Sequence, residues 1–312
     1  MNERVETMVI VTGSFRELTK RIPGSISLYN ALSSSISRLF RVLTRPLKFQ
    51  KINSRVEALE EMMNRVEFSQ IYRVNSSIHP EDLIYDFVIS HPGYADNRRA
   101  AVEYYFSTGD ESARKLISLK HEVGLTGKVE LLEFASGYGC VTRHLVKYTE
   151  EFQITSCDIH KQAIDFIEKT INVPCIESSN LPEDFKAPKQ YGIVFALSFF
   201  SHMPQKTWGR WLAALYRAVE PGGYLIFTTH GLVSHKKFIN HALLDQQGFF
   251  FETNSEQSDL DSAEYGTAIT TPGFVRQEIT KLETATVSLF YEGYWWAHQD
   301  VWVVKKQVKC NS

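Results

Sequence analysis

The residues best placed for chemistry lie in the stretch Val129–Arg143, which reads VELLEFASGYGCVTR. An apolar run is followed by Gly137 and Gly139, and then by the spacing of a helix. Glycines in such a strand-to-helix turn let the backbone approach a ligand closely, because a Cβ atom would occupy the ligand's space. Glu133, four residues before Gly137, adds a carboxylate that fits a ligand carrying an ammonium group.

A second carboxylate follows the next apolar run, Phe152–Cys157, where Asp158 lies 19 residues after Gly139. In a doubly wound sheet the ligand binds outside the carboxyl ends of the strands. A carboxylate at that edge can accept two hydrogen bonds from a ribose diol. NAD enzymes share this logic, but their fingerprint requires a small residue at its third glycine, where this chain has Thr142.

The elements that would position these residues alternate between strand and helix from Val129 to Lys306, which favours a parallel sheet covered by helices on both faces. The end of the chain differs, because the apolar runs Thr284–Tyr291 and Val301–Lys305 are separated only by Glu292–Asp300. That connection is too short for a parallel crossover, so the two strands must form an antiparallel hairpin. The sequence therefore predicts an α/β fold: a doubly wound, Rossmann-like, seven-stranded sheet with a terminal antiparallel hairpin and an α-helical N-terminal extension.

Composition separates the chain into three predicted regions: a helical extension over 1–75, a helical cap region over 76–127, and an α/β domain over 128–308 with an insertion near 245–280. In the cap region we expect two helices with a break at Ser107–Asp110. Beyond the fifth strand we expect a helix around His235–Leu244 and an irregular segment around Asn254–Gly273.

The N-terminal extension combines two amphipathic patterns. Over residues 28–45 apolar residues recur at helical spacing opposite Arg38, Arg41 and Arg45. Such a helix either contacts a membrane or a partner peripherally or is a solvated face packed on the catalytic domain. Over residues 52–66 a short coiled-coil seam favours a homo-oligomer, although barely two heptads are not stable alone.

Bulk properties bound the function. The net charge is −2, which gives no indication of nucleic-acid binding, and the four cysteines are too widely spaced for a zinc site or a disulfide framework. We expect no metal. Without a signal-peptide pattern or an apolar run long enough to span a bilayer, we expect a cytoplasmic protein, with peripheral contact at the inner face of the membrane as the variant that residues 28–45 suggest.

The stretch Val129–Lys306 resembles a class I S-adenosylmethionine (SAM)-dependent methyltransferase. Family enzymes carry an acidic residue and spaced glycines in the first motif, usually with glycine where this chain has Ala135, and a ribose-binding acid after the second strand. The resemblance implies SAM as the cofactor. It assigns cofactor contacts to Glu133, Ala135, Gly137, Gly139, Asp158, Ile159, Glu177, Ser178, Leu197 and Ser198.

The acceptor side is less specific. The ending Glu292–Asp300 and the helical N-terminus resemble methyltransferases associated with bacterial surface-polysaccharide and glycan assembly, which implies O-methylation of a sugar, glycan or other small-molecule acceptor. N-methylation of an amino sugar or small amine, a catalytically silent SAM-fold scaffold and an NAD-dependent oxidoreductase are the alternatives.

A hydroxyl acceptor needs a base, for which the candidates are His298 in the hairpin connection, His230 after the fifth strand and His202 after the fourth. If the hairpin connection lies at the ligand edge, Tyr294, Trp295 and Trp296 could stack on a sugar ring. The competing interpretation is that the tryptophans pack under the insertion at 254–273 and that His298 only caps the turn.

Overall fold

The computed structural model describes residues 49–241, 243–254 and 260–308, with side chains from Arg55 onward. The chain divides into two compact units, residues 1–67 and residues 68–312. Helix α3 (Phe49–Tyr72) begins in the first unit and contains the predicted seam over 52–66. The predicted basic helix over 28–45 lies outside the described residues. Within the described part of the chain, no helix has the length and apolar character needed to cross a membrane.

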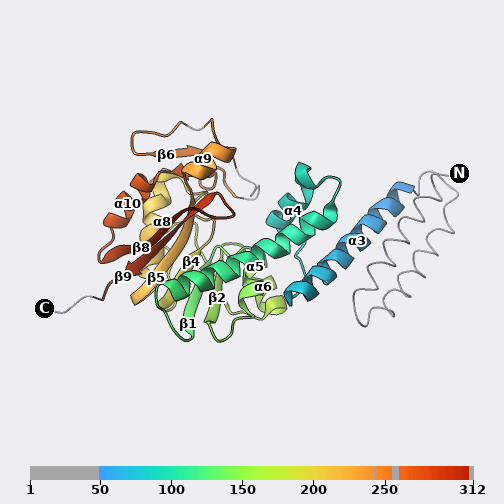
Figure 1. Cartoon of the computed structure of the whole chain (residues 1–312), viewed down its shortest axis with the longest axis horizontal. Coiled ribbons are helices and arrows are strands. Elements are labelled where there is room, and N and C mark those ends of the chain that lie inside the picture. Colours follow the sequence, from blue (N-terminus) through green and yellow to red (C-terminus); the bar gives the residue numbers. More distant parts are fainter. Residues whose placement is uncertain (1–48, 242, 255–259, 309–312) are drawn as a thin grey trace. The chain divides into compact units, whose positions relative to one another are not determined.

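The second unit is built on a seven-stranded sheet whose order is β3-β2-β1-β4-β5-β9-β8 (Figure 1). The parallel strands are β1 (Val129–Phe134), β2 (Phe152–Asp158), β3 (Cys175–Glu177), β4 (Tyr191–Ala196) and β5 (Val219–His230). The order reverses between β1 and β4, which is the switch point where a doubly wound sheet opens a crevice for a ligand.

Strands β8 (Ala285–Trp295) and β9 (Gln299–Lys306) form the predicted antiparallel hairpin. Strand β9 pairs antiparallel with β5 as well, so β8 runs in the same direction as the parallel strands and its carboxyl end lies at the ligand edge. The fold class predicted from the sequence is therefore confirmed.

Alternation along the strands divides the core between the two faces of the sheet. On one face, Leu132, Val194 and Phe227 pack with helices α8 (Gln205–Arg217) and α10 (Pro272–Thr280), where Trp208 and Trp211 supply the predicted helix stripe. On the other face, Leu131, Ile193, Ile226 and Val303 pack with α5 (Arg98–Glu122) and α6 (Thr142–Leu145). Successive strand residues point to opposite faces, so the near-continuous apolar runs fill two cores at once.

The predicted break at Ser107–Asp110 is wrong, because α5 runs unbroken through it. The glycine there serves packing: a Cβ atom on Gly109 would lie 2.4 Å from the backbone oxygen of Cys140. Before α5, helix α4 (Leu83–Ser90) and the short helix η2 (Pro92–Tyr94) complete the cap region. This region has a small hydrophobic core, separate from the two cores on the sheet, to which Phe68, Tyr85 and Tyr105 belong.

The region after β5 is more ordered than the sequence indicates. The helix predicted around His235–Leu244 begins and ends earlier, as α9 (Leu232–Phe238). The segment predicted to be irregular contains strand β7 (Thr267–Thr270), which pairs antiparallel with β6 (Phe249–Glu252) just before that segment. Backbone hydrogen bonds anchor this small sheet, since Ala268 N donates to Ser201 O at 2.8 Å. Helix α7 (Lys161–Phe166) continues into a π-helical turn η3 (Ile167–Ile171).

Candidate cofactor and acceptor site

A cavity of about 1090 Å³ lies at the carboxyl ends of β1, β2, β4 and β5 and reaches the β8–β9 turn and helix α4. Its volume is at the upper end of the range for drug-sized ligands, which leaves room for a second molecule beside a cofactor. Most of the residues predicted for the site line it: Glu133, Ala135, Gly137, Asp158, Ile159, Ser178, Leu197, Ser198, His202, His230 and His298.

Asp158 holds the glycine turn in place. Its Oδ2 atom accepts a hydrogen bond from Gly137 N at 2.8 Å, and its Oδ1 atom accepts one from His160 N at 2.9 Å. The side chain is buried yet lines the cavity. His160 Nδ1 also lies 2.8 Å from Oδ1, so both lone pairs of that atom are occupied. Oδ2 keeps one further lone pair, which leaves an acceptor for a ribose hydroxyl while the carboxylate fixes the turn.

The two glycines of the turn serve different purposes. Gly137 has φ 53°, and a Cβ atom there would meet nothing within 4 Å, as expected where the backbone borders a ligand space. Gly139 does not line the cavity, and a Cβ atom on it would lie 2.6 Å from Ile171 Cδ1. The reason for glycine at position 139 is therefore packing against η3, not the ligand approach that we expected. Ala135 adopts a left-handed backbone with φ 57°, a conformation that costs about 1 kcal/mol for a non-glycine residue.

Glu133 is 4% exposed at the end of β1, and its Oε2 atom accepts a 2.7 Å hydrogen bond from Thr142 Oγ1. Burial raises the pKa of this carboxyl to about 7, although the hydrogen bonds from Thr142 and Ser156 oppose the shift. Among the described residues, the causes of that shift include no basic group. An ammonium group brought into the cavity would favour the ionised form of Glu133.

After β3 the residue that reaches the cavity is Ser178, whose backbone N–H donates to Asp158 O at 2.8 Å. Glu177, which the resemblance also assigns to the cofactor, is exposed and does not line the cavity, because alternate residues of a strand end point to opposite sides. Asn180 lines the cavity close by and was not predicted.

The three candidate histidines form a row along the cavity. The ring of His230 lies 6.1 Å from that of His202 and 5.7 Å from that of His298, measured between centroids. Burial lowers the pKa of His230 to about 3 and, together with Lys237, lowers the pKa of His298. His202 stacks on Tyr265, and its Nδ1 atom lies 2.8 Å from Gly266 O.

The connection between β8 and β9 is shorter than predicted. Trp296 and Ala297 have φ 50° and 57°, and His298 N donates to Trp295 O at 3.1 Å, which is the geometry of a two-residue type I′ turn. Trp295 is fully buried, and its Nε1 atom donates to Ser112 Oγ at 3.0 Å, so it cannot stack on an acceptor. Tyr294 does not line the cavity either; only Trp296 and His298 of this group do.

The remaining wall comes from the cap region, which sequence reasoning did not connect with the site. The apolar side chains of Leu83, Ile84, Phe87 and Tyr104 line the cavity, and Phe87 is 51% exposed there. The near-continuous apolar sequence of α4, which exceeds what one buried face needs, is the signal that could have indicated this wall.

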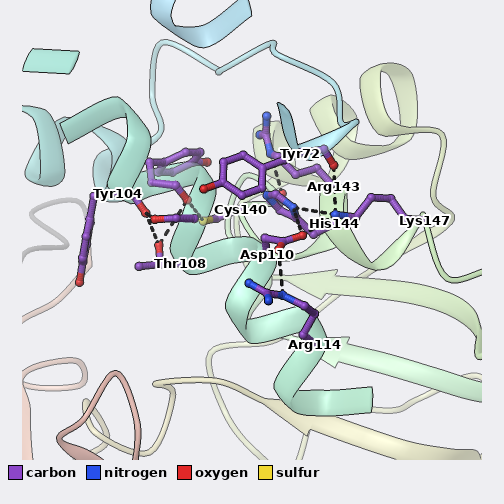
Figure 2. A network of polar contacts seen from close by, with 12 residues as sticks. Tyr72, Tyr104, Thr108, Asp110, Arg114, Cys140, Arg143, His144 and Lys147 are labelled. Atoms are coloured by element: carbon purple, nitrogen blue, oxygen red, sulfur yellow. Dashed lines mark hydrogen bonds and ion pairs between the residues drawn. The ribbon is translucent and has the colours of Figure 1, made fainter. Parts of the chain in front are cut away.

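Arg143 attaches the segment before α4 to the glycine turn. It is fully buried, and its guanidinium donates to the backbone oxygens of Gly139, Asn75 and Ser77 at 3.0, 2.9 and 2.8 Å. Figure 2 shows Arg143 beside His144 and Lys147, with Lys147 and Arg114 both bound to Asp110 of α5. These contacts fix the cap region on the helix that follows the cofactor turn.

Comparison with known proteins agrees with this geometry. Residues 132–225 match a family described as a methyltransferase domain. This match supports a methyltransferase domain over those residues.

One curated relative is phthiotriol/phenolphthiotriol dimycocerosates methyltransferase 1 of Mycobacterium ulcerans (strain Agy99), 26% identical over 137 residues, or 41% of this chain and 48% of that protein. The chain thus spans about half the length of the curated relative it matches.

Similar solved structures include a SAM-dependent methyltransferase from Clostridium acetobutylicum ATCC 824, with a TM-score of 0.48 and 12% identity over 69% of this chain and 96% of that one. Another is SAM-bound CalS10 from Micromonospora echinaspora, an amino pentose methyltransferase, with a TM-score of 0.47 and 11% identity over 64% of this chain and 92% of that one.

Replacing Asp158 by Ala should weaken binding of S-adenosylhomocysteine (SAH) by about 1.5–3 kcal/mol, the range for hydrogen bonds to a charged group. Isothermal titration calorimetry measures this directly, with Asp165→Ala as the control, because Asp165 is an exposed carboxylate of α7 that pairs with Lys161. Equal affinity of a folded Asp158→Ala variant and the wild type would remove Asp158 from the cofactor site.

Glu133 should make stability depend on pH. Its folded pKa lies above the ordinary value of 4.5, so its contribution to stability is complete below about pH 4.5 and is lost as the pH rises through about 7. Glu133→Gln abolishes that loss. The difference in the free energy of unfolding, Glu133→Gln minus wild type, should therefore rise by about 2–3 kcal/mol between about pH 4 and pH 8.5. Urea unfolding at both pH values tests this, and a difference that does not change with pH would contradict the raised pKa.

Proposed function

We propose that this chain transfers a methyl group from SAM to a hydroxyl of a sugar or glycan intermediate. The observation that carries the proposal is one continuous cavity, with the predicted cofactor residues at one end and three histidines at the other. When bound, SAM supplies a methyl group on a sulfonium, which is the electrophile.

The residues present fit this cofactor. Gly137 leaves the ligand side of the turn open, and the carboxylate of Asp158 is positioned for the ribose hydroxyls. The resemblance assigns the adenine to Ser178 and the methionine part to the backbone at Leu197 and Ser198, and all three residues line the cavity. Glu133 is a buried carboxyl that pairs with no cationic side chain in the described part of the chain, and the ammonium of the methionine part would supply a cation.

The chain's part in the reaction is to orient the acceptor and to receive its proton. The acceptor oxygen would use a lone pair to form the new O–CH₃ bond. The electrons of the S–CH₃ bond would remain on sulfur, and the product of the cofactor would be SAH. The hydroxyl proton goes to His298, which is neutral at physiological pH because burial and Lys237 lower its pKa. Trp296 lines the cavity beside His298 and offers an aromatic face to a sugar ring.

The glycan class of the acceptor rests on the resemblance of Glu292–Asp300 and of the helical N-terminus, and an N-methylated amine is the alternative acceptor. Peripheral contact with an anionic membrane through residues 28–45 and self-association through the N-terminal helices belong to the same proposal. So does a cytoplasmic location.

His298→Gln should lower kcat by about 10²-fold or more, as expected for a lost general base, while the dissociation constant of SAM stays the same. Trp296→Ala should raise KM for the acceptor. Methyl transfer from isotopically labelled SAM to a panel of sugars, amino sugars and glycan intermediates provides the measurement. His121→Gln is the matched control, because His121 is 56% exposed and lies outside the cavity.

Three results would count against the proposal. SAH binding without transfer to any acceptor of the panel would favour the scaffold function. Transfer only to amines would favour N-methylation. Full turnover of His298→Gln together with loss in His202→Gln or His230→Gln would move the base to another strand end.

A further inference from the structure

A closed set of polar side chains lies beneath the histidine row, where β4, β5 and β9 end. Ser198 and Ser201 follow β4, Thr228 belongs to β5, and Gln299 begins β9 directly opposite His230 in the strand register. Ser201, Thr228 and Gln299 are almost completely buried. Buried polar groups of this kind must satisfy one another, so the position of each proton can be deduced.

The deduction begins at the serines. Ser201 Oγ donates its only proton to Ser198 O at 2.7 Å, so in its 3.0 Å contact with Ser198 Oγ it must accept. Ser198 Oγ has then donated its own proton, and the group 2.9 Å away on Gln299 must be a donor, the amide nitrogen Nε2.

The contacts of Thr228 agree with the same orientation. Ser198 N donates to Thr228 Oγ1 at 2.8 Å, and the Thr228 hydroxyl donates to Gln299 at 2.7 Å. The atom of Gln299 that accepts is the oxygen Oε1. The serine contacts therefore fix the side-chain amide of Gln299 in one orientation, and the Thr228 contact agrees with it.

The fixed amide determines the tautomer of His230. The second proton of Gln299 Nε2 points at His230 Nε2, 3.3 Å away, which must accept it with its lone pair. In neutral His230 the ring proton is then on Nδ1, a buried atom that makes no well-formed hydrogen bond among the described residues. The nearby carbonyl of Ala268, which opposes the lowering of the His230 pKa, is consistent with a proton on Nδ1.

A different residue determines the tautomer of His298. Ser234, 1% exposed, donates its hydroxyl proton to His298 O at 2.8 Å. In its 3.0 Å contact with His298 Nδ1 it must therefore accept, which places the ring proton on Nδ1 and the lone pair on Nε2. Unlike His230 Nε2, this atom has no donor bound to it among the described residues, and His298 lines the cavity.

We infer that Gln299 and Ser234 are positioning residues that divide the roles of two neighbouring histidines. Gln299 occupies the lone pair of His230, so this ring cannot accept the acceptor's proton. Ser234 leaves the lone pair of His298 open at Nε2, so this ring receives it. The catalytic part of the inference rests on the proposed function, whereas the two tautomers do not.

The tautomers are measured by NMR on the full-length protein carrying ¹⁵N-labelled histidine, with the signals assigned through His230→Gln and His298→Gln. Wild-type His230 and His298 should both show a protonated Nδ1 and an unprotonated Nε2. Gln299→Glu places an acceptor opposite His230 Nε2 and should move the His230 proton to that nitrogen without changing His298. Ser234→Ala should change His298 alone. The control Gln307→Glu, just beyond β9, should change neither ring.

Kinetics separates the two parts of the inference. Ser234→Ala should lower kcat about tenfold with unchanged SAM affinity, and Ser234→Thr should retain the wild-type kcat. In a protein that already carries His298→Gln, Ser234→Ala should lower kcat no further. A wild-type His230 protonated on Nε2, or a His298 ring that Ser234→Ala does not affect, would overturn the inference. The expected tautomers with full turnover in Ser234→Ala and His298→Gln would instead refute the assignment of the base in the proposed function.

Discussion

The antiparallel pairing of β9 with β5 determines what lies at the acceptor end of the cavity. Seven residue pairs, from Tyr224–Lys305 to His230–Gln299, fix the register. A shift of one residue would turn Gln299 away from His230 and would exchange the two core faces that β9 serves. The same pairing returns the chain to the ligand edge, so that the β8–β9 turn places Trp296 and His298 on the cavity wall.

At the cofactor end the corresponding constraint is the hydrogen bond from Gly137 N to Asp158. It joins the ends of β1 and β2, two strands that are adjacent in the sheet, through a backbone that only residues tolerant of positive φ can follow. Ala135 and Ser198 adopt left-handed conformations nearby although neither is glycine. Backbone strain of this kind persists where the surrounding structure holds it, and it gathers at binding sites. The buried Glu133, with its raised pKa, is a second local cost that an ammonium ligand would relieve.

Much of the fold could be predicted because alternation, glycine turns and connection length are local signals. The short link between the last two strands sufficed to establish the hairpin, and the spacing of Glu133, the glycines and Asp158 located the ligand edge. Contacts between distant segments were harder to predict, because even the apolar sequence of α4 does not say which segment it packs against. Neither the cavity wall from α4 nor the anchoring of residues 75–77 by Arg143 was predicted. The turn at Trp296 and Ala297 lacks the glycine or asparagine that normally marks it, so the sequence did not decide between a buried and a cavity-facing Trp295.

The central claim is that SAM binds across the glycine turn with its methyl group directed toward the histidine row. A crystal structure of the protein with SAH tests it most directly. We expect the ribose hydroxyls to lie within hydrogen-bond distance of Asp158, the ammonium group to lie beside Glu133, and the sulfur to lie on the side of the cavity that leads to His298. SAH bound without contact to Asp158 and Glu133, or with its sulfur directed away from the histidines, would contradict the account.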